Sequence, residues 1–367
     1  MIIRFQNTPT REHLARIQGL GGQFHRRLEL VRSGVFTVPV ETVSAIASAP
    51  EVRSIHLDHA LQASDDLTNA AVGVDAAFQT GFDGSGVTVA VIDSGINDTH
   101  PDLRQSAGDA SRVLYHQDFT GTNITDAAGN VIYDTYGHGT HVAGILGGNG
   151  SLSNGRYRGV APNVSFVDLR VLDQNGGGSD SSVIAAIEQA IALKAAYNIR
   201  IINLSLGRPV WDYSTNDPLC QAVEAAWQAG IVTVVAAGNY GRLSVNGSGG
   251  YGTITAPGND PLVLTVGAMK SMGTAARTDD LIASYSSKGP TTDDHVVKPG
   301  ILAPGNLVNS VIAHGSTLEA ELPANRVTGT ADGNFDYFTL SGTSMATPVV
   351  SGAVAILSIA AKPVSDP

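Results

Sequence analysis

Apolar segments that suit buried strands alternate with segments that suit helices from residue 87 onward. The strand segments are apolar almost throughout, not only at every second residue. Strands of this kind, separated by helices, are typical of a parallel sheet that is buried on both faces. The sequence therefore predicts a large α/β domain with a mostly parallel sheet. Its expected strands are 87–92, 164–171, 201–204, 231–236 and 262–266, and its expected helices include 182–197 and 218–228.

Residues 1–64 show a different pattern, which predicts a small separate unit. Strand segments at 2–6, 23–31, 35–40 and 52–57 are interrupted by helical segments at 11–20 and 41–48. The order strand-helix-strand-strand-helix-strand is that of a ferredoxin-like α+β fold. The polar stretch 62–68 has no periodicity and is the best candidate for a linker. We therefore expect two domains, residues 1–64 and residues 65–367.

Charge is distributed unevenly between these two parts. Residues 1–64 hold seven arginines and five acidic residues, which gives them a net charge of +2. Because the whole chain has a net charge of −11, the remaining residues carry −13. An acidic body excludes nucleic acid and anionic membrane as expected partners, because both require a basic face. No apolar run reaches the ~18 residues of a membrane-spanning helix. The opposite charges favour docking of the N-terminal segment on the body, although solvation of its surface explains such a difference equally well.

The single cysteine, Cys220, excludes an intramolecular disulfide. It lies in an apolar pattern that predicts a buried small side chain and not a nucleophile. The residues after Met1 lack the charged start, apolar stretch and small-residue cleavage site of a secretory signal. Our expectation is a monomeric, secreted protein whose leader is not part of this chain, and an intracellular protein is the alternative.

Four polar residues stand where the predicted strands end or helices begin, the places where functional groups gather in a parallel sheet. Asp93 follows the first strand of the sheet, and Asn239 follows the strand at 231–236. His138 stands where a glycine-flanked loop becomes a helix, and Ser344 precedes the apolar helix 349–361, whose start favours negative charge. Each has a plainer explanation when taken alone, such as Asp93 as a turn residue.

Together these residue types can activate a serine, whose hydroxyl is a poor nucleophile without an adjacent base. His138 would take the proton of Ser344, and Asp93 would fix the imidazole tautomer and stabilise its charged form. The Ser344 N–H and the Asn239 side chain would donate to the oxyanion. His138 and His141 could instead bind a metal, but no H-E-x-x-H pattern is present, so no metal ligand is predicted.

At these residues the chain resembles the subtilisin-like serine proteases. Residues 93–96 (Asp-Ser-Gly-Ile), 138–144 (His-Gly-Thr-His-Val-Ala-Gly) and 342–348 (Gly-Thr-Ser-Met-Ala-Thr-Pro) match the three signature blocks in the family's order, and 236–239 (Ala-Ala-Gly-Asn) match its oxyanion block. In α/β-hydrolases the serine comes first, and in chymotrypsin-like enzymes the histidine does. The resemblance covers nearly the whole chain. It implies a three-layer α/β fold and an endopeptidase that works through an acyl-enzyme.

The resemblance also implies where a peptide binds. Two segments match the family's substrate-binding edges, which pair with an extended peptide through backbone hydrogen bonds. For the glycine segment 176–178 a flexible loop remains the alternative. Ala256-Pro257 falls where the family has a proline after a cis bond that lines the primary pocket. The two edges are Ser205, Leu206 and Gly207, and Gly176, Gly177 and Gly178.

The N-terminal unit resembles the family's propeptide, which acts as a folding chaperone and then as an inhibitor. Spacing back from Asp93 predicts self-cleavage between Ser64 and Asp65, with the apolar Leu61 four residues before the cut. The expected partners are therefore protein substrates and the chain's own propeptide, and self-processing would make the chain a zymogen.

No cofactor is expected to be required. In many members the segment after the histidine helix supplies a calcium loop together with the aspartate aligned with Asp102. Here residues 147–155 read Gly-Gly-Asn-Gly-Ser-Leu-Ser-Asn-Gly, so a structural calcium cannot be assigned to them. Residues 306–339 are longer than usual, and we expect them to form a flap near the cleft.

Two other functions fit parts of the pattern. One is a catalytically silent homologue that only binds, against which all four reaction positions hold competent residues. The other is an esterase with the same residues. The two glycine-rich edges suit a peptide backbone, and the G-x-S-x-G elbow of such esterases is absent.

Overall fold

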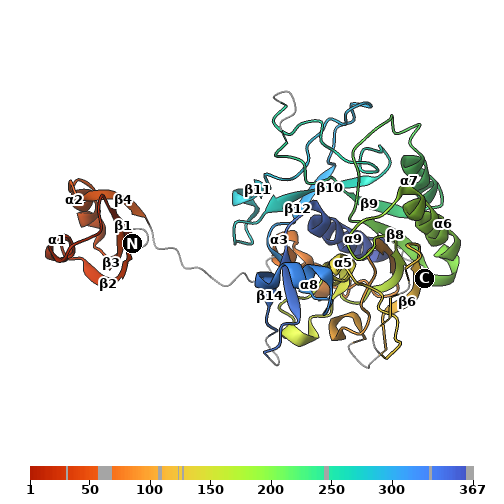
Figure 1. Cartoon of the computed structure of the whole chain (residues 1–367), viewed down its shortest axis with the longest axis horizontal. Helices are drawn as coiled ribbons and strands as arrows, with labels where there is room; N and C mark the ends of the chain where they lie inside the picture. Colours follow the sequence, from red (N-terminus) through yellow and green to blue (C-terminus); the bar gives the residue numbers. More distant parts are fainter. Residues whose placement is uncertain are drawn as a thin grey trace. The chain divides into compact units, whose positions relative to one another are not determined.

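In the computed structural model the chain divides into two compact units, Met1–Ala63 and Ser64–Pro367. The structure describes residues 1–29, 32–56, 68–105, 110–122, 124–125, 128–243, 248–329 and 333–360. Ser64 and Asp65, the residues of the predicted cleavage site, lie outside these ranges, as does the predicted linker except for Thr68. Figure 1 labels the elements of both units.

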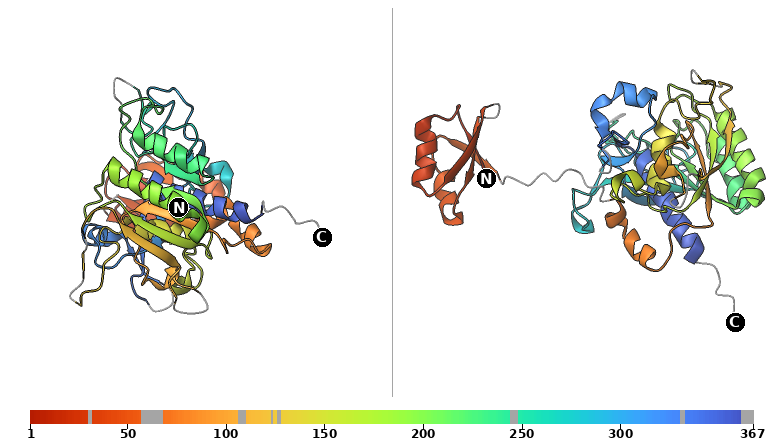
Figure 2. Two further views of the ribbon diagram at one scale, coloured as in Figure 1. Left: turned by 90° about the vertical axis from the view of Figure 1, so that its right-hand side faces the viewer. Right: turned by 90° about the horizontal axis from the view of Figure 1, so that it is seen from below.

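The N-terminal unit is a four-stranded antiparallel sheet with two helices on one side of it (Figure 2). Its strand order, β2-β3-β1-β4, is that of a ferredoxin-like fold. Side chains alternate along β1, since Ile3 and Phe5 are buried in the unit's apolar core whereas Arg4 is exposed. The elements are β1 (Ile2–Phe5), α1 (Arg11–Gly19), β2 (Gln23–Leu28), β3 (Ser33–Thr37), α2 (Val43–Ala47) and β4 (Val52–His56).

The larger unit follows with helices and strands in alternation. Its first half comprises α3 (Thr68–Val72), α4 (Val74–Gln79), β5 (Thr88–Asp93), β6 (Val113–Asp118), α5 (His138–Gly147), β7 (Ser165–Arg170), α6 (Asp180–Tyr197) and β8 (Ile199–Leu204). Its second half comprises α7 (Pro218–Gln228), β9 (Val232–Ala236), β10 (Leu264–Lys270), β11 (Leu281–Ile282), β12 (Ile301–Pro304), β13 (Val308–Val311), α8 (Thr317–Glu321), β14 (Arg326–Val327), β15 (Tyr337–Leu340) and α9 (Thr343–Ala360). No described helix combines the length and apolar character that crossing a membrane demands.

An eight-stranded sheet forms the centre of the larger unit. Its order is β11-β10-β9-β8-β5-β7-β6, and β12 pairs with β10 beside this path. Every neighbouring pair is parallel except β10 and β11, so the predicted mostly parallel sheet is confirmed. Sequence patterns missed β6 because this edge strand carries polar side chains at 115–118.

Helices cover both faces of this sheet (Figure 1). On β5, Val89 and Val91 pack into the apolar cluster that contains α5 and α9. The alternating residues Ala90 and Ile92 pack into the cluster that contains α6 and α7. Because both faces are buried, every residue of the strand has to be small or apolar until its carboxyl end, where Asp93 stands.

Residues 306–339 were expected to form a flap near the cleft, and that expectation is wrong for the parts that form β13 and β15. They contribute to a small sheet of order β13-β15-β14 that packs into the body. All four residues of β13 are buried, and the Ser310 hydroxyl donates to the His141 carbonyl oxygen of α5 at 2.8 Å.

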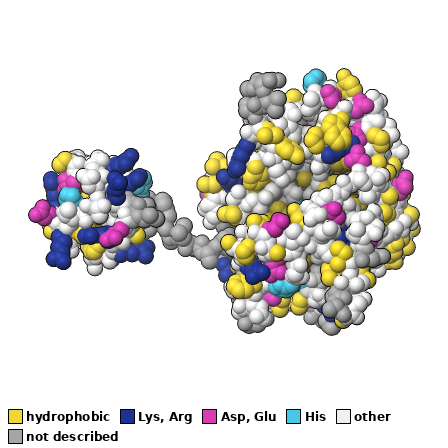
Figure 3. All heavy atoms as spheres, in the orientation of Figure 1, with side chains coloured by type: hydrophobic (Ala, Val, Ile, Leu, Met, Phe, Trp, Pro, Cys, Tyr) yellow, Lys and Arg dark blue, Asp and Glu magenta, His cyan; other side chains and the backbone are white. Residues whose placement is uncertain are grey.

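The surfaces of the two units differ in charge. On the faces seen in Figure 3, arginine side chains crowd the small unit, whereas charged side chains are sparse on the large one. This agrees with the unequal distribution of arginine and acidic residues along the sequence.

Candidate active site

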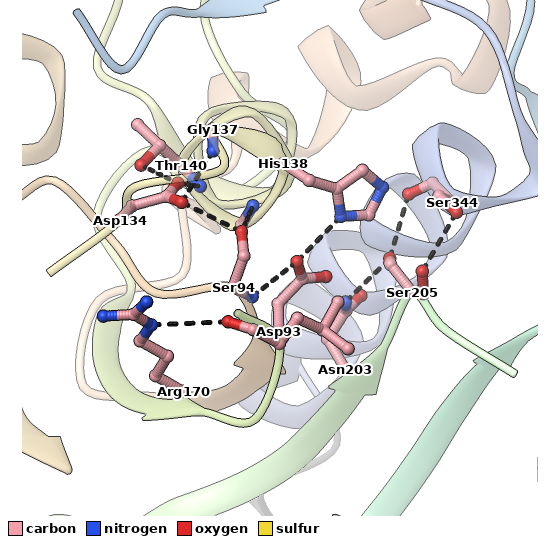
Figure 4. A network of polar contacts seen from close by, with 12 residues as sticks. Asp93, Ser94, Asp134, Gly137, His138, Thr140, Arg170, Asn203, Ser205 and Ser344 are labelled. Carbon is pink, nitrogen blue, oxygen red and sulfur yellow. Dashed lines mark hydrogen bonds and ion pairs between the residues drawn. The ribbon is translucent and has the colours of Figure 1, made fainter. Parts of the chain in front are cut away.

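Asp93 and His138 form a hydrogen-bonded pair at the carboxyl end of β5 (Figure 4). Asp93 is fully buried, and its Oδ1 accepts from the Ser94 N–H at 2.8 Å and from His138 Nδ1 at 2.7 Å. Because Nδ1 is bonded to the Asp93 carboxylate, the neutral His138 ring carries its proton on Nδ1, and Nε2 then has a lone pair. His138 therefore has the tautomer of a general base.

The glycines that flank His138 are needed for its position. Gly137 has φ 101°, and a Cβ atom there would lie 2.5 Å from the Ser316 Oγ. A Cβ atom at Gly139 would lie 2.2 Å from the Gly95 carbonyl oxygen, in the turn that follows Asp93. The Gly-His-Gly sequence thus lets α5 begin close against that turn, which brings the imidazole to the carboxylate.

Ser344 is the second residue of α9, which begins at Thr343, six residues before the predicted start at Val349. The prediction failed because Pro348 usually breaks helices: it has no N–H to donate to the carbonyl four residues earlier. That carbonyl belongs to Ser344, and it accepts a hydrogen bond from the Ser205 Oγ at 2.9 Å instead. Ser205 thus supplies the bond that Pro348 cannot make.

The structure brings Asp93, His138 and Ser344 together from β5, α5 and α9. The His138 ring points toward Ser344 (Figure 4). In this structure the Ser344 hydroxyl donates to the Ser205 carbonyl oxygen at 3.0 Å. To give its proton to His138, the hydroxyl would have to leave the Ser205 carbonyl oxygen, and χ1 of a serine can change between staggered rotamers.

Asn239 follows β9 and faces the start of α9. Its Oδ1 accepts from the Thr343 N–H at 2.9 Å and from the Thr343 Oγ1 at 3.1 Å. These two bonds fix the orientation of the amide, so that its Nδ2 is left as a donor beside Ser344. Sequence reasoning did not identify Thr343 as the residue that orients Asn239.

A cleft of about 780 Å³ joins these groups to the predicted substrate edges. His138, Asn239 and Ser344 line it, and so does Thr255, which precedes the cis bond Ala256-Pro257. Among the described residues, the lining includes Gly176, Gly178, Ser205, Leu206 and Gly207 from the two edges. Gly177 is not among the lining residues, and its N–H and carbonyl are bonded to Asp173 in a turn.

Sequence reasoning missed Asp134, a buried carboxylate beside the Asp93–His138 pair. It accepts from the Ser94 Oγ, the Gly137 N–H, and the N–H and Oγ1 of Thr140 at 2.5–2.9 Å (Figure 4). Burial raises its pKa to about 6 against these four donors. It ties the turn after Asp93 to the start of α5, and its only sequence signal was an acid four residues before His138.

Two histidines of α5 have opposite electrostatic surroundings. Burial lowers the pKa of His138, but the charges of Asp93 and Asp134 outweigh it and raise that pKa above its ordinary value. For His141, burial dominates and lowers the pKa to about 3. Its Nε2 donates to the Phe338 carbonyl oxygen at 2.8 Å, so His141 packs behind the site as a neutral ring. No group of three His, Cys, Asp or Glu side chains suited to a metal occurs among the described residues.

A second His–Asp pair lies at a cavity of about 200 Å³ near β6 and β7. His116 Nδ1 donates to Asp168 Oδ2 at 2.8 Å, and the ring stacks on Tyr133 at 3.8 Å. The same Asp168 oxygen accepts from the Ile96 N–H at 3.1 Å. Burial lowers the pKa of His116, but the carboxylates of Asp168 and Asp98 outweigh it and raise the pKa to about 9.

This pair is expected to make stability fall as the pH rises from about 6.5 to 9. Because the folded pKa of His116 lies above the unfolded one, its contribution is complete below pH 6.5 and is lost as the ring deprotonates at pH 9. Denaturant unfolding of the native chain should show a loss on the order of 1–3 kcal/mol over this range, relative to a His116→Gln variant. Parallel pH profiles of the two proteins would contradict this assignment.

Comparisons with known proteins identify relatives of this chain. The profile of the Subtilase family matches residues 84–365. Serine protease AprX of Bacillus subtilis (strain 168) is 36% identical over 325 residues, covering 86% of this chain and 66% of the relative. Subtilisin E of the same strain is 30% identical over 341 residues, covering 92% of this chain and 73% of the relative. This chain therefore spans about two thirds to three quarters of their length.

Solved structures show the same fold. Sphericase aligns with a TM-score of 0.57 at 31% identity, covering 80% of this chain and 85% of the other. A cold adapted subtilisin-like serine proteinase aligns with a TM-score of 0.53 at 31% identity, covering 76% of this chain and 78% of the other. By its profile match, its relatives and its fold, the chain belongs to the subtilase family.

Proposed function

We propose that the larger unit is a serine endopeptidase that hydrolyses peptide bonds of protein substrates through an acyl-enzyme. The observation that carries the proposal is the Asp93–His138 pair. His138 is bonded to Asp93 through Nδ1, and its ring points toward Ser344 in the cleft. Membership of a family whose relatives are named serine proteases and subtilisins supports it.

In the first step, His138 Nε2 takes the proton of Ser344 as Oγ attacks the scissile carbonyl carbon. Asp93 stabilises the imidazolium that forms. The Asn239 Nδ2 and the Ser344 N–H donate to the oxyanion. His138 then gives the proton to the leaving amine, and a water molecule, deprotonated by His138, releases the acyl group.

The two edges of the cleft suit a peptide substrate. The backbone groups at 205–207 and at Gly178 can pair with an extended chain as additional strands. Gly177 does not take part, because both its backbone groups are already bonded to Asp173. An ester substrate would need only the reacting groups. Comparing hydrolysis of casein with hydrolysis of a short acyl ester would therefore separate a peptidase from an esterase, and activity on the ester alone would contradict the proposal.

An Asn239→Asp variant is expected to lower kcat by at least about 10²-fold, with little change in KM. The carboxylate can still accept from Thr343, but it cannot donate to the oxyanion, and loss of one such donor in subtilisin itself costs about 10²–10³. A Thr343→Ser variant keeps both bonds to Asn239 and is the matched control. Unchanged kcat in Asn239→Asp would remove Asn239 from the mechanism.

We propose further that residues 1–64 are a propeptide that the enzyme cuts from itself near Ser64 and Asp65. The compact N-terminal unit and its positive net charge support an accessory domain that docks on an acidic body. Purified Ser344→Ala protein is expected to stay at full length while the native chain is cut, as mass spectrometry of the intact chains would show. Cutting of the purified alanine variant would refute self-processing.

A further inference from the structure

One arginine connects the two proposed substrate edges. Arg208 directly follows the edge 205–207, and Asp180, the first residue of α6, lies two residues after the edge 176–178. The Arg208 Nε donates to both oxygens of Asp180, at 3.0 and 2.9 Å. Both residues line the cleft. The ion pair therefore links the edges at one end of the cleft.

Further contacts fix the Arg208 guanidinium, including a bond from its Nη1 to the Pro209 carbonyl oxygen at 3.1 Å. Its Nη2 donates to both oxygens of Asp217 at 2.9 Å. Asp217 is buried and caps α7, its Oδ1 also accepting from the Leu219 N–H at 2.9 Å. The guanidinium stacks on Trp211 with 4.6 Å between its carbon and the ring centroid. The Arg208 side chain is only 16% exposed, so it is held as a rigid part of the wall.

The charges at this end need an arginine. A planar guanidinium can serve two carboxylates at once, which the compact ammonium of a lysine cannot do with the same geometry. Removing Arg208 would also leave Asp217 as a buried, unpaired charge. Asp180, whose side chain is 41% exposed, can be changed without that penalty.

The wall next to this ion pair is apolar. Leu172, Val183, Leu206 and Leu219 line the same cleft and belong to one apolar cluster with α6 and α7. A peptide side chain directed to this end would be buried against these four residues. The guanidinium and the Asp180 carboxylate would then limit the space available to it.

We propose that the Arg208–Asp180 ion pair sets the substrate preference at the apolar end of the cleft. It admits small and medium aliphatic side chains of a bound peptide and excludes large aromatic ones, which would need the volume that the ion pair fills. This inference rests on the proposed peptidase function and adds a specificity-determining residue pair to it.

The test uses peptides in which one position on the acyl side of the scissile bond is changed at a time from valine to phenylalanine. In Asp180→Ala, the ratio of kcat/KM for phenylalanine over valine is expected to rise about tenfold or more at one position only. Arg208→Ala should shift the same position. Glu188→Ala, which removes an exposed carboxylate of α6 that is not among the residues lining the cleft, should leave every ratio as in the native chain.

Affinity gives a second readout that does not depend on catalysis. The same peptides are titrated by calorimetry into Ser344→Ala protein with and without Asp180→Ala, and the affinity ratio should shift at the same position. Ratios that stay unchanged in both measurements, in an Asp180→Ala protein with native Tm, would overturn the inference. If affinities shift but the native chain hydrolyses no peptide, the proposed function fails while the ion pair keeps its role in selection.

A second, independent observation concerns a buried cation at the end of α5. Arg112 is 5% exposed and donates to four backbone carbonyl oxygens. These belong to Asp102 (2.7 Å), Gly147 (2.6 Å), Val164 (2.9 Å) and Arg104 (3.1 Å). Burial lowers its pKa to about 10, so the guanidinium remains charged at neutral pH.

Asp102 aligns with an aspartate that binds calcium in many family members. Here both oxygens of its carboxylate accept hydrogen bonds from other groups of the protein. Asp102 Oδ1 accepts from the Ser151 Oγ at 2.8 Å and the Leu152 N–H at 3.1 Å. Its Oδ2 accepts from the Tyr337 hydroxyl at 2.6 Å. Calcium needs six to eight oxygen ligands, and these oxygens are already bound by donors. The residues present therefore do not fit a calcium ion at this place.

We propose that Arg112 takes the structural role of a bound cation here. Ca²⁺ and EDTA should give the full chain the same Tm, whereas Arg112→Met should lower Tm by about 5 °C or more, without rescue by Ca²⁺. Arg112→Lys should recover part of the loss. A Ca²⁺-dependent rise in the Tm of the native chain that disappears in Asp102→Asn would overturn the proposal, whether or not Arg112→Met folds.

Discussion

Ser344→Ala is expected to lower kcat for peptide hydrolysis by about 10⁶-fold, the loss measured when the serine or the histidine of subtilisin itself is removed. His138→Ala should have a similar effect. The double variant should be hardly worse than either single one, because the hydroxyl and the imidazole act as one unit in the same step. Steady-state kinetics on one peptide substrate would measure all three.

The matched control is Ser358→Ala, a change of another serine on α9 whose hydroxyl donates to the Val354 carbonyl oxygen of the same helix. It should keep native kcat. Losses of Ser344→Ala and His138→Ala that multiply in the double variant would contradict a joint role for the two side chains.

Asp93→Asn is expected to lower kcat by about 10⁴-fold while the fold is kept. An asparagine amide that donates to Nδ1 would force the imidazole proton onto Nε2, which could then no longer accept the proton of Ser344. The present tautomer depends on the bond of 2.7 Å from His138 Nδ1 to Asp93 Oδ1. Steady-state kinetics of the purified variant would measure the loss of kcat, and its circular dichroism spectrum would show whether the fold is kept.

The same variant should change the pH dependence of the residual activity. His138 has to be neutral to act as a base, so kcat/KM falls as the pH drops through its pKa. Asp93 contributes to raising that pKa against the effect of burial. The acid limb of kcat/KM should therefore move to lower pH in Asp93→Asn. A limb that stays in place would show that another group titrates there.

Much of the larger unit could be predicted from sequence because its central strands are buried on both faces. Val89 to Ile92 are all apolar for that reason, and the helix at 218–228 begins and ends at the predicted residues. The edge strand β6 could not be found, since its outward polar residues carry no such pattern. The start of α9 was placed too late because the carbonyl freed by Pro348 is satisfied by Ser205, which is distant in sequence.

The candidate residues Asp93, His138 and Ser344 could be proposed from sequence because each stands beside glycines or small residues at the end of an element. Their supporting contacts could not. Asp134 reaches the Ser94 hydroxyl across 40 positions, and Thr343 reaches Asn239 across 104. Arg208 reads as an ordinary surface residue until the structure places it between Asp180 and Asp217. Such networks depend on which loops the fold brings together, a property that local patterns do not contain.

The most direct test of the central claim is covalent labelling by a fluorophosphonate, located by peptide mass spectrometry. We predict one adduct, on the Ser344 Oγ, in the native chain, and none in Ser344→Ala. In His138→Ala, labelling should slow by orders of magnitude because no base removes the proton. A native chain that is not labelled at Ser344, or one labelled there equally fast without His138, would contradict an alcohol activated by this imidazole.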